Sequence, residues 1–250
     1  MSKQIQVTYQ GEIALLQIAS DEHPYLEKGY VEELRLAVNE LNDHPFIKVV
    51  IVTGGNMNFC LGGSHDSLTE SNNLEALPFY VADIPRLLLS IKVPTIACME
   101  GHAIGGGLLI GLWCDLCYLA ESSLYGANFM ALGFTPGMGG TIVVEQALGP
   151  YLARKYLFTG KLFKGKEIKS LNCPISSFVF PKQQLKQITL EIAEELCELP
   201  VASLQLLKNN QSRLRKENLE EGLREEQKMH KRLFSQEEIK NFISEHHQQN

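Results

Sequence analysis

The stretch GHAIGGGLLIGLWCD, from Gly101 to Asp115, places three successive glycines directly before an apolar run, with no acid, base or nucleophile beside them. It follows VPTIACMEG, Val93 to Gly101, a short apolar segment typical of a buried strand. The earlier stretch KVVIVTGG repeats this order of strand and glycine loop, and a helix is predicted between them from about Leu74 to Ser90. The alternation predicts an α/β layered fold in which the loops at Gly62-Gly63 and Gly105-Gly106-Gly107 could lie side by side.

The two ends of the chain extend this pattern. At the start, residues 5–9 and 13–18 are predicted to form a hairpin around Gln10-Gly11. Beyond about Pro181 the strand pattern stops, and successive helices are predicted over residues 183–199, 201–215, 219–234 and 236–245.

Glycine loops after strands have two possible uses here. Neither loop carries the Lys-Ser/Thr pair of a P-loop or a G-x-G-x-x-G followed by a suitably placed acid, so both common phosphate motifs are excluded. Residues without Cβ let backbone N–H groups approach a ligand oxygen, and two such donors make an oxyanion hole. The alternative is that the glycines only permit close packing of strand and helix.

Composition excludes several other classes of function. The chain has 250 residues, 44% hydrophobic and 21% charged, with a formal net charge of -6. This balance argues against a general affinity for nucleic acid or anionic lipid. No apolar run approaches the roughly 20 residues of a membrane span, and MSKQIQVTYQ lacks the apolar core of a signal peptide, so a cytoplasmic location is expected.

Six cysteines lie mostly within apolar runs, which favours buried thiols over a disulfide framework. Cys114 and Cys117 form a C-x-x-C without a second pair, so neither a metal nor a redox site is expected.

Three segments in order resemble the signatures of the enoyl-CoA hydratase/isomerase, or crotonase, superfamily: FCLGGSHD, GHAIGGGLLIGLWCD and LGFTPGMGGT. The resemblance implies a spiral of repeated ββα units over residues 1–195. It also implies a C-terminal helical region over residues 196–250 that builds a homotrimer or a dimer of trimers. The implied substrate is a thioester whose carbonyl accepts hydrogen bonds from the N–H groups of Gly63 and Gly106.

Hydratases of this superfamily use two glutamates, and the corresponding positions here hold Leu109 and Phe129. Neither side chain transfers a proton, so hydration by paired carboxylates is not expected. Decarboxylation fits instead, because loss of carbon dioxide itself generates the enolate, and an apolar pocket around Leu109 and Phe129 would favour it.

A narrower resemblance points the same way. The stretches GHAIGGGLLIGL, YGANFMALGFTPGMG and EQKMH resemble the decarboxylating enoyl-CoA-hydratase-like proteins of polyketide β-branching cassettes. That resemblance implies conversion of a 3-methylglutaconyl thioester to a 3-methylcrotonyl thioester, with no cofactor beyond the phosphopantetheine arm of the substrate. The alternatives are an enoyl thioester isomerase, using His230 or water, and a non-catalytic thioester-binding subunit.

The remaining candidates concern the proton and the carboxylate. His230 matches a functional histidine of the β-branching decarboxylases and is the expected proton donor, with Glu226 one helical turn before it and able to reach it. Those enzymes bind the substrate carboxylate with a lysine, which residues 54–91 lack, so His65, Tyr80 and Arg86 are the candidate substitutes.

The carrier of the acyl group is either an acyl carrier protein or coenzyme A. A set of basic residues could dock an acidic carrier protein, or could simply form a solvated helix surface: Arg213, Arg215, Lys216, Lys228, Lys231 and Arg232.

Overall fold

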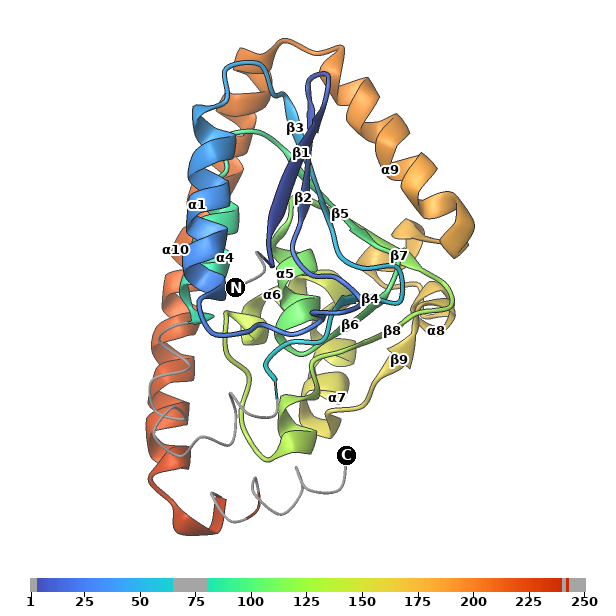
Figure 1. Ribbon diagram of the computed structural model, residues 1–250. Coiled ribbons are helices and arrows are strands. Elements are labelled where there is room, and N and C mark those ends of the chain that lie inside the picture. Colours follow the sequence, from blue (N-terminus) through green and yellow to red (C-terminus); the bar gives the residue numbers. More distant parts are fainter. Residues whose placement is uncertain (1–3, 65–80, 240–241, 243–250) are drawn as a thin grey trace.

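The computed structural model describes residues 4–64, 81–239 and 242, and it is built around two sheets (Figure 1). The six-stranded sheet has the order β1-β2-β3-β5-β7-β10. Only the β1/β2 pair is antiparallel, and the other neighbours are parallel. Its strands are β1 (Gln6–Gln10), β2 (Ile13–Gln17), β3 (Val49–Thr53), β5 (Thr95–Met99), β7 (Leu116–Ala120) and β10 (Val179–Phe180).

The second sheet is smaller and has the order β4-β6-β8-β9. Its strands are β4 (Asn58–Cys60), β6 (His102–Ile104), β8 (Leu124–Gly126) and β9 (Phe163–Lys164). Along the chain, β3, β5 and β7 of the large sheet are each followed directly by β4, β6 and β8 of the small sheet. This repetition confirms the predicted α/β spiral of ββα units.

The predicted hairpin is also confirmed. Gly11 connects β1 to β2 with a φ of +60°, a value that glycine adopts without steric cost.

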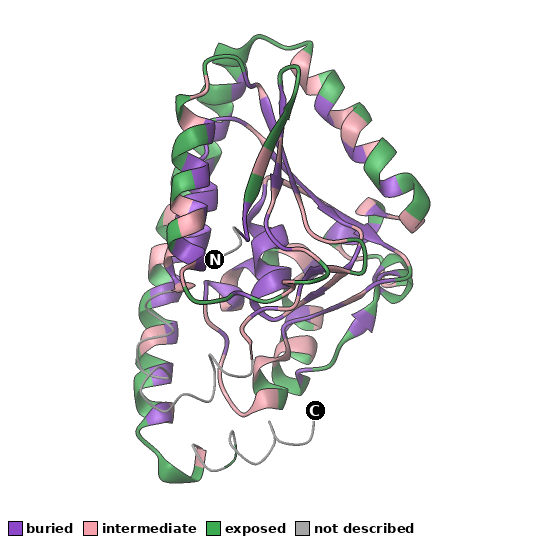
Figure 2. Cartoon of the chain, in the orientation of Figure 1, coloured by how far each residue is buried: buried purple, intermediate pink, exposed green. Residues whose placement is uncertain are grey.

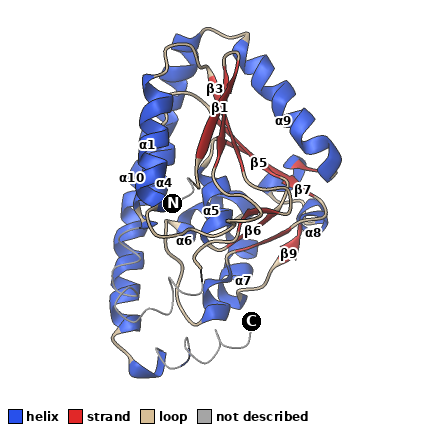
Figure 3. Ribbon diagram, in the orientation of Figure 1, coloured by secondary structure: helices blue, strands red, loops and turns tan. Residues whose placement is uncertain are grey.

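Helices cover both faces of the large sheet (Figure 3). The main core packs α1 (Tyr30–Asp43), α4 (Asp83–Ser90), α5 (Gly106–Trp113) and α6 (Gly140–Leu148) against one face. On the other face, a second core packs α9 (Lys182–Cys197) on β3, β5 and β7. Because β5 is buried along its whole length, its sequence TIACM has no polar alternation (Figure 2).

Shorter helices link these elements: the 3₁₀ helices η1 (Asn128–Leu132) and η2 (Pro174–Phe178), and the α-helices α7 (Pro150–Thr159) and α8 (Gly165–Ser170). The helix predicted from about residue 74 to 90 lies partly outside the described residues, and α4 is its described part.

The C-terminal helices differ from the prediction in one respect. The segments expected over 201–215 and 219–234 form one helix of 34 residues, α10 (Val201–Phe234), because the residues between them include neither Gly nor Pro to end it. This helix packs along α4 and α6 (Figure 1). The predicted boundary between residues 195 and 196 falls inside α9. None of the described helices is long and apolar enough to cross a membrane.

Candidate active site

The two glycine loops meet, as predicted. A Cβ atom added to Gly62 would lie 2.9 Å from the carbonyl oxygen of Ile104 and 3.1 Å from the backbone nitrogen of Gly106. Gly62 also has a φ of +79°, which residues with side chains rarely adopt. Glycine at this position therefore allows the first loop to reach the second.

The N–H groups of Gly63 and Gly106 have directions fixed by their own peptide units, because C=O and N–H of a trans peptide point opposite ways. The carbonyl of Gly62 accepts a hydrogen bond from the Leu26 N–H at 2.7 Å, so the Gly63 N–H points away from Leu26. The carbonyl of Gly105 accepts from the Leu109 N–H at 3.3 Å inside α5. The Gly106 N–H therefore points out of the N-terminus of α5, where a helix favours negative charge.

The two possible uses of glycine apply to different residues. A Cβ atom on Gly107 would lie 1.9 Å from the carbonyl oxygen of Cys60, so glycine there permits close packing of α5 on β4. At Gly106 the nearest atoms to an added Cβ are side-chain atoms, Met138 Sδ at 3.0 Å and Leu26 Cδ1 at 3.2 Å. Gly107 serves packing, whereas Gly106 carries the outward N–H.

Leu109 and Phe129 give the surroundings of the glycine loops an apolar character. Leu109 is fully buried in α5 and its Cδ1 atom would lie 3.0 Å from a Cβ on Gly140. Phe129 of η1 is half-buried; its ring packs edge-on against Phe134 at 5.8 Å and lies 3.9 Å from the place of a Cβ on Gly105. Neither position offers a group that could activate water.

His230 of α10 lies next to the turn that precedes α6. Its Nε2 donates to the carbonyl of Thr135 at 2.9 Å, so Nε2 carries the proton of the neutral ring. The Nδ1 atom is buried and no described residue bonds to it. The ring stacks on Phe234 at 5.6 Å, and burial lowers the pKa of His230, although contacts with two backbone carbonyls oppose this shift.

The expectation that Glu226 reaches His230 is wrong. Its carboxylate accepts hydrogen bonds from the N–H of Gly139 at 2.8 Å, the N–H of Thr141 at 3.0 Å and the Thr141 hydroxyl at 2.7 Å. These donors lie at the N-terminus of α6, where the unpaired N–H groups of the helix attract a carboxylate more strongly than a neutral imidazole does.

Of the three candidates for binding the substrate carboxylate, Arg86 alone lies within the described residues. Arg86 donates from Nε and Nη2 to Glu220 at 2.6 and 2.7 Å, and from Nη1 to Asp83 at 3.0 Å, so it joins α4 to α10. Binding a substrate carboxylate would require it to give up these ion pairs. His65 and Tyr80 lie outside the described residues.

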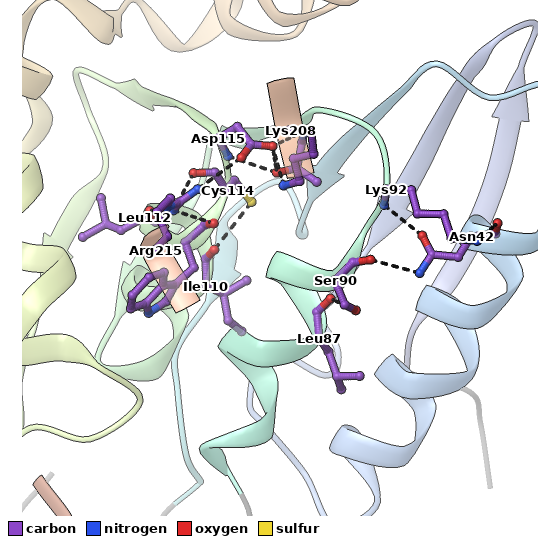
Figure 4. A network of polar contacts seen from close by, with 12 residues as sticks. Asn42, Leu87, Ser90, Lys92, Ile110, Leu112, Cys114, Asp115, Lys208 and Arg215 are labelled. Atoms are coloured by element: carbon purple, nitrogen blue, oxygen red, sulfur yellow. Dashed lines mark hydrogen bonds and ion pairs between the residues drawn. The ribbon is translucent and has the colours of Figure 1, made fainter. Parts of the chain in front are cut away.

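Not all of the basic residues of α10 that could dock an acidic carrier protein are free to do so. The Arg215 side chain is only 19% exposed, and its guanidinium donates to Asp115 and to the carbonyls of Leu112, Trp113 and Cys114 at the end of α5 (Figure 4). Arg213 and Lys228 are exposed and pair with glutamates on their own helix.

Two structural features near the site were not predicted. Met138 has a left-handed φ of +58°, its carbonyl accepts from Trp113 Nε1 at 2.8 Å, and its side chain abuts Gly106. Asp115 pairs with both Lys208 and Arg215 (Figure 4). The pattern PGMGG could have suggested a tight turn, but no sequence signal pairs Asp115 with residues about 100 positions away.

The six cysteine thiols are free, and each is buried or half-buried. Burial raises the pKa of the Cys114 thiol to about 12 and that of Cys117 well above its usual value. Both are therefore protonated core thiols. Within the described residues, no group of His, Cys, Asp or Glu side chains is arranged to hold a metal ion.

Comparison with known proteins identifies the family. Residues 8–248 match the family model described as enoyl-CoA hydratase/isomerase. The bacillaene synthase decarboxylase PksI of Bacillus subtilis is 32% identical over 236 residues, which cover 93% of each chain.

Solved structures are similar over nearly the whole chain. The ECH2 decarboxylase domain of CurF from Lyngbya majuscula superposes with a TM-score of 0.83 at 28% identity, covering 98% of this chain and 100% of that one. A structure from a dehydratase/decarboxylase enzyme couple involved in polyketide β-branching gives 0.86 at 30% identity, covering 96% and 94%. With its two glycine loops joined and its family match spanning the spiral and the long C-terminal helix, the chain belongs to the enoyl-CoA hydratase/isomerase family.

Proposed function

We propose that this protein is a decarboxylase of polyketide β-branching that converts a 3-methylglutaconyl thioester to a 3-methylcrotonyl thioester. One observation carries the proposal. Two backbone N–H groups are directed away from the segments that hold them, and Leu109 and Phe129 stand at the positions that the family resemblance assigns to the hydratase carboxylates. Such a site can stabilise an enolate but has no carboxylate there to activate water. The decarboxylases among its relatives support the same reaction.

The reaction balances with the groups present. The bond between the terminal carboxylate and its neighbouring carbon breaks, carbon dioxide leaves, and the electron pair passes through the double bond into the thioester carbonyl. The N–H groups of Gly63 and Gly106 would bind the resulting oxyanion, each contributing about 3 kcal/mol. A proton then adds to the terminal carbon of the dienolate.

His230 is the proposed source of that proton. Its Nε2–H is held by the Thr135 carbonyl, so the proton is already on the nitrogen that faces the turn next to Gly106. Donation requires this N–H to exchange the carbonyl for the dienolate carbon. Transfer of this proton neutralises the dienolate and leaves the ring as an imidazolate, which takes up a proton from water, so the negative charge of the lost carboxylate leaves as hydroxide.

The proposed substrate carrier is an acyl carrier protein or coenzyme A, and the phosphopantetheine arm shared by both is the only cofactor proposed. We further propose a homotrimer or dimer of trimers in the cytoplasm. Large apolar side chains support self-association: Tyr151 and Phe158, one face of α7, are 87% and 75% exposed, and Leu206 of α10 is 72% exposed. Sedimentation should give a trimer or hexamer, and a stable monomer would contradict this part.

The activity is tested with 3-methylglutaconyl carrier protein followed by mass spectrometry. We expect loss of carbon dioxide by the wild type, and a deuterium from heavy water at the terminal carbon. His230→Ala should slow product formation by about 10² to 10⁴ while the oligomer persists. A wild-type rate with unchanged deuterium position in His230→Ala would remove the histidine from the mechanism.

Crotonyl thioesters test whether the protein hydrates an enoyl thioester. Absorbance at the enoyl thioester band should stay constant, since Leu109 and Phe129 cannot activate water. Hydration near ordinary enzymatic rates, about 10 per second, would refute the proposed absence of paired acid and base. A double-bond shift without carbon dioxide release would identify an isomerase, and no turnover with tight thioester binding would identify a binding subunit.

A further inference from the structure

Helix α10 presents three residues, spaced four apart, to the first turn of α6 and to the segment that leads into it. A Cβ atom on Gly222 would lie 2.7 Å from Ile142, which shows how closely the helices approach. One turn later Glu226 binds Gly139 and Thr141, and one turn after that His230 binds the Thr135 carbonyl. Because residues four apart lie on the same side of a helix, α10 follows this segment continuously.

The segment so held includes a strained turn. Met138 is in the left-handed region at φ +58° and Gly139 follows at φ +71°. A residue with a side chain keeps this conformation only when its surroundings enforce it. The Met138 side chain packs against Gly106, and His230 Cε1 would lie 3.2 Å from a Cβ on Gly137. The turn thus lies next to the oxyanion donor Gly106 through Met138 and next to His230 through Gly137.

Glu226 is an unusual group to find here. It is 1% exposed, and none of the described Lys, Arg or His side chains forms an ion pair with it. Burying a carboxylate without a cation is unfavourable, and burial indeed raises the pKa of Glu226. Three hydrogen bonds, donated to its two oxygens by the N-terminus of α6, offset this cost.

We propose that Glu226 is a positioning residue that fixes the turn from Pro136 to Thr141, and so sets both the place of Met138 beside Gly106 and the hydrogen bond from His230 to Thr135. Glu226 touches neither glycine loop and is not itself a proton donor to the substrate. The inference rests on the proposed function, since it assigns the oxyanion donor and His230 to one reaction.

The first test replaces Glu226 with glutamine. Glu226→Gln keeps the shape but puts an NH₂ group against backbone donors, so at least one of the three hydrogen bonds is lost. Hydrogen bonds to a charged acceptor have free energies that correspond to a loss in kcat of about 10- to 100-fold. KM should change less than about threefold, because the oxyanion donors and His230 act on the transition state more than on the bound substrate. Glu221→Gln, an exposed glutamate on the same helix, is the matched control and should behave as wild type.

The second readout does not depend on turnover. The measurement is ¹⁵N NMR of the histidine side chains, and the signal that disappears in His230→Gln is that of His230. In the wild type and in Glu221→Gln, the proton on His230 Nε2 should be protected from exchange with water. In Glu226→Gln this protection should fall. If kcat and the His230 signal both stay at wild-type values in Glu226→Gln, the positioning role is refuted.

Two further comparisons distinguish failure of the positioning role from misfolding of the variant and from failure of the proposed function. Should Glu226→Gln fail to fold, Thr141→Val decides: it deletes only the hydroxyl that donates to Glu226 at 2.7 Å, and is expected to lower kcat by about threefold to tenfold, whereas a wild-type kcat would overturn the inference. Should the wild type leave the 3-methylglutaconyl thioester unchanged, the proposed function fails, and the NMR comparison still judges Glu226.

Discussion

The buried charges around Asp115 allow a quantitative prediction for Asp115→Asn. Asp115 Oδ2 accepts from Lys208 Nζ at 2.6 Å and from the N–H and hydroxyl of Thr95, and Oδ1 accepts from Arg215 at 3.1 Å (Figure 4). One carboxylate therefore compensates two cations, and the Lys208 side chain is only 2% exposed. We expect Asp115→Asn to lower the free energy of unfolding by about 3 to 5 kcal/mol, the cost of leaving a buried charge unpaired.

Lys208→Met gives the contrasting value. It removes the cation whose pKa burial already lowers, and it leaves Asp115 paired with Arg215. The loss should therefore be below about 1.5 kcal/mol, because Asp115 keeps Arg215 and Thr95 as partners and no buried charge is left unpaired. The exposed pair of Arg213 and Glu217 supplies a control, Arg213→Gln, expected within about 0.5 kcal/mol of wild type.

Urea unfolding at one fixed protomer concentration measures all three variants, since self-association would otherwise shift the midpoint. In Asp115→Asn the lowered pKa of Lys208 falls further. The unfolded chain then holds a proton on Lys208 that the folded chain lacks. The variant should therefore regain stability as the pH rises toward 10.5, the ordinary pKa of lysine. A loss below about 1 kcal/mol in Asp115→Asn, or an equal loss in Lys208→Met, would refute this account.

Three further predictions test other parts of the structure. Gly107→Ala should cost about 3 kcal/mol or prevent folding, because its Cβ would meet the backbone carbonyl of Cys60 at 1.9 Å; an unchanged melting temperature would contradict the packing of α5 on β4. Met138→Gly should be at least as stable as Met138→Ala in urea, reversing the usual order, since the left-handed φ of +58° costs alanine about 1 kcal/mol; the ordinary order would show that the turn is unstrained. Burial lowers the pKa of His230, so the unfolded chain takes up a proton first and stability should fall as pH drops below 6.5. Unfolding curves between about pH 5 and 8 should show a smaller fall in His230→Gln, and an identical fall would assign the effect to other groups.

Much of the fold follows from local sequence patterns. The apolar run of β3 is buried on both faces, and the Gly11 turn joins two strands that alternate or cluster apolar residues. Both features depend on residues close together in the chain, so the strands and the hairpin were predictable. The fusion of two predicted helices into α10 was not, because charged residues between two apolar stretches are as compatible with a continuous surface helix as with a loop.

The sequence by itself determined the side chains available at the site: glycines without a Cβ, and the apolar residues Leu109 and Phe129 at the positions that the family resemblance assigns to the hydratase carboxylates. These properties belong to single residues and to resemblance over short motifs. Tertiary structure alone decided the partners of the charged groups. Glu226 binds residues 85 and 87 positions away, and Asp115 binds Lys208 at a separation of 93. The physical reason is that electrostatic attraction and hydrogen bonding depend on distance in space, and for such groups only the packing of α10 against α5 and α6 sets that distance.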